Sequence, residues 1–98
     1  MTLLKREMGF TRPEFMRILP SALHDYPYRI DGDQIHITPP ESPDHTITIR
    51  LGAEAVRRIA LLALPYLHVE FDFSTVDDEA VSRRFLTQFD LYYRKGGG

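Results

Sequence analysis

The chain has 98 residues, 12 basic against 14 acidic side chains, and no cysteine. A chain of this length builds one hydrophobic core. Its near-balanced charge excludes the basic surface of a general nucleic-acid binder or of a protein held on an anionic membrane. Without cysteine it has no disulfide, thiolate nucleophile or zinc–cysteine cluster. The longest apolar run, residues 59–64, is too short to span a bilayer, and the first residues lack a signal-peptide core. We expect a cytoplasmic, prokaryotic protein with one domain over residues 10–95.

The first predicted element is a helix that begins near Thr11. Thr11 can cap this helix, and Glu14 completes a capping box. Pro20 removes a backbone donor, so it is expected to kink or end the helix. Residues 1–9 fit either a flexible tail or a short helical turn.

Three strands are predicted next. Residues 28–37 alternate around Asp31-Gly32-Asp33, which favours a tight hairpin because Asp-Gly readily adopts positive φ angles. Three prolines within residues 39–43 then prevent strand pairing. Residues 46–51 alternate again and predict a third strand.

A helix from about Ala53 to Leu64 is expected after Gly52, with apolar residues at helical spacing and Pro65 at its end. Residues 67–73 then alternate strictly between apolar and polar side chains, which indicates a half-buried strand. An acidic first turn after Ser74 starts a last helix that runs to about Tyr93. Gly96 is expected to end it and to open a flexible glycine tail over residues 96–98.

These elements predict an α+β fold in the order α-β-β-β-α-β-α. The third and fourth strands are joined by a helix, which implies a parallel, right-handed crossover in an otherwise antiparallel four-stranded sheet. The result would be a two-layer sandwich with all helices on one face and the other face open. Strand parity places on the open face Arg29, Gln34, His36, Thr48, Arg50, His68, Glu70 and Asp72.

His68, Glu70 and Asp72 form the sharpest candidate for a metal site. Residues two apart on a strand share a face, and His36 from another strand would complete a His/carboxylate set for a divalent metal such as zinc, manganese or iron. The alternative is a solvated strand whose acidic groups form cross-strand ion pairs with Arg29 and Arg50.

A second candidate is an anion site made by Arg50, Arg57 and Arg58. If Gly52 opens a helix, these arginines surround the helix N-terminus, which attracts phosphate and other anions. Adjacent arginines on the solvated flank of a helix are the alternative.

Two resemblances bear on function. The predicted order over residues 11–64 resembles that of double-stranded-RNA-binding domains, which implies duplex RNA as a ligand. Those domains carry a lysine-rich cluster where this chain has Ala53-Glu54-Ala55-Val56. The terminal Gly96-Gly97-Gly98 is similar to the end of sulfur carriers and ubiquitin-like proteins, which implies activation at the last glycine. A helix cap and a flexible tail explain the same glycines.

No catalytic set emerges from the sequence. Ser21 and His24 are near in sequence but lack an orienting third group. We therefore predict a non-enzymatic binding or adaptor domain that contacts a protein partner, or a second copy of itself, through the open polar face. A free edge strand offers a second route, and Tyr66 and Tyr93 are candidate anchors unless they belong to the core.

Overall fold

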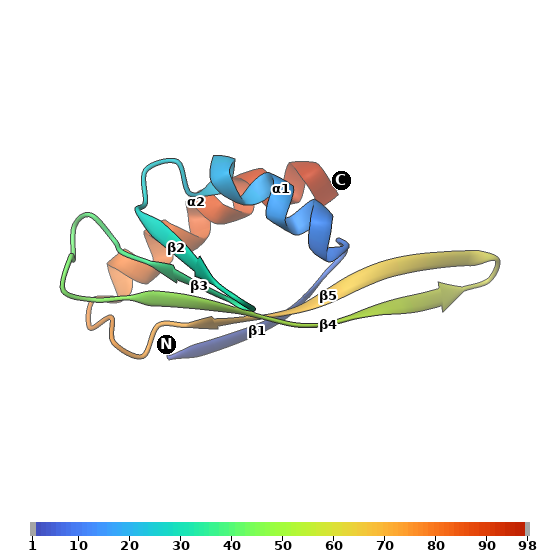
Figure 1. The fold of residues 1–98 in the computed structure, drawn as a ribbon, viewed down its shortest axis with the longest axis horizontal. Coiled ribbons are helices and arrows are strands. Elements are labelled where there is room, and N and C mark those ends of the chain that lie inside the picture. Colours follow the sequence, from blue (N-terminus) through green and yellow to red (C-terminus); the bar gives the residue numbers. More distant parts are fainter. Residues whose placement is uncertain (1, 98) are drawn as a thin grey trace.

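The computed structural model describes residues 2–97 and shows an α+β fold (Figure 1). The elements in chain order are β1 (Leu3–Met8), α1 (Arg12–Ala22), β2 (Tyr28–Asp31), β3 (Gln34–Ile37), β4 (Ile47–Ile59), β5 (Leu62–Asp72) and α2 (Glu79–Gly97). The strands form one open antiparallel sheet in the order β1-β5-β4-β3-β2. Both helices cover the same face of this sheet.

The core lies between that face and the two helices. The alternating residues of β5 supply its centre, since Leu67, Val69 and Phe71 are buried. The helices are tied to each other by the Tyr93 hydroxyl, which donates a hydrogen bond of 2.7 Å to the backbone carbonyl of Phe15. Burial raises the pKa of Tyr93. Tyr93 is therefore a core residue and not the exposed anchor considered above.

The predictions that rest on helix capping and turn chemistry are confirmed. Thr11 accepts a hydrogen bond from the Glu14 amide at 3.2 Å, and the Glu14 carboxylate accepts one from the Thr11 amide at 2.8 Å, which completes the capping box. Pro20 lies inside α1, which ends two residues later. Gly32 adopts φ 60° in the β2–β3 turn.

The largest error of the sequence analysis concerns residues 53–64. They form the outer half of a long antiparallel hairpin, β4–β5, and not a helix. The parallel crossover and the four-stranded mixed sheet are therefore wrong, and so is the element order that resembled double-stranded-RNA-binding domains. Helix propensity is a weak preference, and here the continuous backbone pairing of two strands anchored in the core overrides it.

Both chain ends also differ from expectation. Residues 3–8 lie within the segment expected to be a tail or a helical turn, yet they form β1, which pairs with β5 along its length. This makes β5 a central strand. At the other end, α2 extends to Gly97, and Gly98 of the expected glycine tail lies outside the described residues. Neither helix of the described chain is long and apolar enough to cross a membrane.

A bulge in β4 separates the core half of the hairpin from its outer half. Leu51 pairs with Val69 and Glu54 with Leu67, so Gly52 and Ala53 oppose the single residue His68. A Cβ on Gly52 would lie 3.1 Å from the Cβ of His68, so this close approach favours glycine. The extra residue exchanges the two faces of β4 beyond this point.

The tip of the hairpin is strained. Ile59 pairs with Leu62, and of the two residues between them Ala60 has φ 53°, in the left-handed region that favours glycine. We expect Ala60→Gly to relieve this strain by about 0.5–1 kcal/mol and to slow hydrogen exchange of the hairpin amides roughly two- to fivefold.

The matched control is Ala63→Gly, which places the same residue in a strand, where glycine destabilises. It should speed exchange of the same amides. Faster exchange in Ala60→Gly would contradict the strained turn.

Candidate functional site

The strand register places the predicted open-face residues on one side of the sheet, opposite the helices. Arg29 pairs with His36, His36 with Thr48, and Arg50 with Glu70, and residues directly opposite in a sheet share a face. Strand β1 adds Lys5 and Glu7, which the sequence analysis did not assign to a strand.

Arg50 is the centre of an ion-pair network on this face. Its guanidinium lies 3.1 Å from a Glu70 carboxylate oxygen and 2.9 Å from an Asp72 oxygen. Lys5 lies 4.0 Å from Glu70. These contacts match the cross-strand pairing that was the alternative to a metal site, although the partner of both acids is Arg50 and not Arg29.

Asp72 is the acid most affected by its surroundings. Hydrogen bonding from Ser74, whose amide lies 2.9 Å from the carboxylate, is the main cause that lowers the pKa of Asp72, and Arg50 lowers it further. Its carboxylate is therefore held in the charged form by the strand end and the sheet face together.

His68 does not join these acids. Its ring packs against Tyr66 at a centroid distance of 5.3 Å, beside the bulge, while Glu70 and Asp72 face Arg50. Within residues 2–97, no group of three or more His, Asp or Glu side chains is arranged to hold a metal ion. The divalent-metal site remains a prediction to which this geometry adds no support.

The three arginines of the proposed anion site are not brought together. Arg50 is held by Glu70 and Asp72, while Arg57 and Arg58 are neighbours in a strand and therefore point to opposite faces of β4. The helix N-terminus that was to attract the anion does not exist. This arrangement removes the physical basis of the anion site.

The most unusual feature is the outer part of the β4–β5 hairpin, residues 53–66, which we call the arm. It projects beyond both helices along the longest dimension of the molecule, which measures 47 Å against 24 and 22 Å (Figure 1). Of the nine large hydrophobic side chains exposed in the described chain, the arm carries five, namely Val56, Ile59, Leu61, Leu62 and Leu64. Leu61, at the tip, is fully exposed.

The root of the arm is fixed to the body. Arg57 pairs with Glu7 of β1 at 2.7 Å, and its guanidinium lies 4.7 Å from the centre of the Tyr66 ring. Glu7, Arg57 and Tyr66 also line a pocket of about 230 Å³. These contacts orient the arm, whereas its tip, residues 60–62, lies far from both helices (Figure 1).

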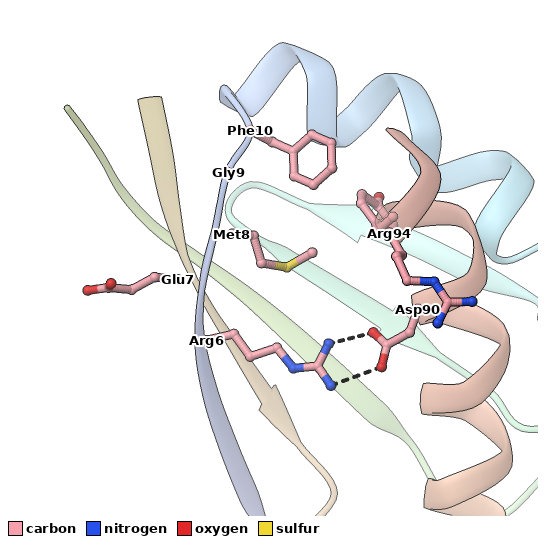
Figure 2. A pocket seen from close by; sticks show the side chains of 8 residues that line it. Arg6, Glu7, Met8, Gly9, Phe10, Asp90 and Arg94 are labelled. Atoms are coloured by element: carbon pink, nitrogen blue, oxygen red, sulfur yellow. Dashed lines mark hydrogen bonds and ion pairs between the residues drawn. The ribbon is translucent and has the colours of Figure 1, made fainter. Parts of the chain in front are cut away.

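An open pocket of about 620 Å³ lies between the end of β1 and the last turns of α2. Figure 2 shows Arg6 reaching across it to Asp90 while Glu7 points to the other side of β1. The Arg6 guanidinium binds both Asp90 carboxylate oxygens, one of them at 3.1 Å, and lies 5.3 Å from the centre of the Phe71 ring. Arg6 and Asp90 neutralise each other and join β1 to α2, so we assign this pocket a structural role.

Two serine–histidine pairs lie close together, and neither forms a catalytic set. His24 directs Nδ1 to the Ser21 backbone carbonyl at 3.0 Å, so it is not placed to activate the hydroxyl. The Ser42 hydroxyl contacts His45 Nδ1, and His45 Nε2 lies 3.7 Å from Asp77, an alignment that the sequence analysis missed. Asp77 is 91% exposed, so this contact stabilises the loop before β4 and does not form a buried catalytic set.

Comparison of the chain with protein-family models, with curated proteins and with solved structures finds no match. We therefore infer function from the geometry of the arm and the open face.

The lowered pKa of Asp72 predicts a contribution to acid unfolding. A carboxylate whose pKa lies below its ordinary value of 3.8 stabilises the fold above that value, and this stabilisation is lost as the pH falls through the lower folded-state pKa. We expect Asp72→Asn to reduce the loss of unfolding free energy between about pH 5 and about pH 2, measured by urea titration.

Asp44→Asn is the control, since Asp44 is an exposed aspartate outside the ion pairs of the described residues. An equal pH dependence in wild type and Asp72→Asn would show that Asp72 contributes nothing.

Proposed function

We propose that this protein is a non-enzymatic protein-binding domain and that the arm is its binding element. The observation that carries this proposal is the group of five exposed large apolar side chains on one projecting hairpin. Three of them, Ile59, Leu62 and Leu64, share the open side of the arm, and Val56 lies on the other side. Exposed apolar groups on soluble proteins mark interaction sites, because exposing them to water costs free energy that association recovers.

The open polar face, where binding was expected from the sequence, is a weaker candidate. The acids at its centre already have partners, since Arg50 binds both Glu70 and Asp72. Replacing these pairs with intermolecular ones gains little, because exposed ion pairs contribute about 0–1 kcal/mol. The five apolar side chains of the arm are instead left exposed to water in the described chain.

The two surfaces are nevertheless continuous. Because the bulge exchanges the faces of β4, Ile59 and Arg57 lie on the same side of the sheet as Arg50, and Leu62 and Leu64 lie opposite them on β5. A partner seated on this side of the arm would meet an apolar tip first and the charged open face at its margin. This matches the usual interface, in which an apolar centre is surrounded by a polar rim.

We expect Leu62→Ser to weaken binding at least about tenfold, a cost of about 1.4 kcal/mol, because it removes an apolar contact from the centre of the surface. The test immobilises the wild type and the variant, exposes each to the native cell extract, identifies the retained proteins and measures their dissociation constants.

The control is Leu91→Ser on α2. Leu91 is 48% exposed and Leu62 is 61% exposed, so the two substitutions remove similar surface leucines from different places. The proposal requires a partner that the control retains and Leu62→Ser loses. Equal retention by all three proteins would reject the arm as the binding element.

A further inference from the structure

The edges of the arm carry unused backbone groups. Strand β3 pairs with β4 only along residues 47–50, and the last bond on that side runs from the Leu51 amide to the Asp33 carbonyl at 2.8 Å. From Gly52 to Ala60 at the tip, no described strand lies beside this edge of β4. Such an edge is a template for pairing with another chain.

The opposite edge of the arm is protected. Strand β5 contains Pro65 within the arm, and proline in a paired strand occupies a position whose missing amide would point away from the neighbouring strand. The outer edge of β5 therefore lacks a donor. Residues 52–60 contain no proline, so the edge of β4 keeps every backbone donor.

The charged residues of the free edge attract each other when two copies of this edge run side by side in opposite directions. In an antiparallel pair of two β4 strands centred on Val56, Glu54 of one copy faces Arg58 of the other, and the same contact occurs twice by symmetry. Neither Glu54 nor Arg58 takes part in an ion pair among the described residues. Opposite charges directly across a sheet stabilise the pairing.

The length of the free edge independently selects the same centre. The edge begins at Gly52, after the last bond to the β2–β3 turn, and ends at Ala60, so its midpoint is Val56. In that register Ile59 falls opposite Ala53, a small residue, and residue 61 falls opposite residue 51. The tip of each arm would therefore stop beside the β2–β3 turn of the other copy.

We propose that the partner of the arm is a second copy of this chain, joined by antiparallel β4–β4 pairing across a two-fold axis at Val56. This inference rests on the proposed function and names its partner. The pairing joins the two arms into a four-stranded sheet in the order β5-β4-β4-β5, with Ile59, Leu62 and Leu64 of both arms on one face and Val56 of both arms on the other.

Charge reversal tests this register. Glu54→Arg places two arginines opposite each other, and Arg58→Glu does the same with two glutamates, so each single variant should raise the dimer dissociation constant roughly 10- to 100-fold, measured by sedimentation equilibrium. The double variant Glu54→Arg/Arg58→Glu restores both opposite-charge contacts and should dimerise within about threefold of wild type.

Mixing gives the sharper result. In an equal mixture of the two single variants, a heterodimer pairs residues 54 and 58 twice, and each of these two contacts joins an arginine to a glutamate. Two proteins that are separately monomeric should therefore form a heterodimer. Arg83→Glu on α2 makes the same change in net charge as Arg58→Glu at an exposed site outside the ion pairs of the described chain, and it should dimerise like wild type.

A cysteine probe tests the symmetry axis. The chain has no cysteine, and residues paired across a two-fold axis have Cα atoms about 4.5–5.5 Å apart, within the range of a disulfide. Val56→Cys should therefore oxidise to a covalent dimer. Ala55→Cys, whose copies do not face each other in this register, should do so much more slowly.

Three outcomes would overturn the inference: a wild type that stays monomeric up to about 1 mM, a dimer indifferent to both charge reversals, or no heterodimer on mixing. These outcomes leave the proposed function to its own test, since a partner retained by Leu91→Ser and lost by Leu62→Ser would still identify the arm as a binding element for a different protein.

Discussion

The antiparallel pairing of β4 with β5 is the constraint on which the rest of this structure depends. Strand β5 lies between β1 and β4, and its buried residues Leu67, Val69 and Phe71 occupy the centre of the core. The same two strands continue past the helices, so the backbone ladder that organises the core also builds the arm. A two-stranded hairpin alone is marginally stable in water, and its anchorage in a five-stranded sheet makes a projecting arm possible.

The bulge at Gly52 determines which side chains of β4 lie on each face of the arm. One extra residue in β4 exchanges its faces, which places Arg57 beside Glu7 and Tyr66 and leaves Arg58 on the other side. Without this residue Arg57 would lie on the helix side of the sheet. The bulge therefore fixes the root of the arm to β1 and leaves the free edge with Glu54 and Arg58 available to another chain.

Polar and apolar surfaces have different roles in this molecule. The open face satisfies its own charges through Arg50, Glu70 and Asp72, so it is stable when exposed. The arm has exposed apolar side chains and, along β4, a backbone edge with unpaired donors and acceptors, and neither is satisfied within the described residues. This contrast makes the arm the stronger candidate for function, although the sequence alone predicted binding through the polar face.

Much of the fold was predictable from short-range patterns. The capping box of Thr11 and Glu14, the turn at Gly32 and the alternation of residues 67–72 each have a local cause, and each is confirmed. The segment 53–64 was mispredicted because alanine, leucine and arginine favour helices. One feature of the sequence indicated that this segment is not a surface helix. The run 59–64 has no polar residue, so it does not match the one-sided apolar stripe of such a helix.

Residue patterns along the chain were enough to predict an α+β fold, the apolar inner face of its sheet and the composition of its outer face, because alternation and capping depend on neighbours within a few residues. The pairing of β1 with β5, the hairpin over residues 53–64 and the binding of both outer-face acids by Arg50 became evident only in the folded chain. Each of these contacts joins residues distant in the chain, and their pairing depends on the whole sheet, which outweighs the local preference of any one segment.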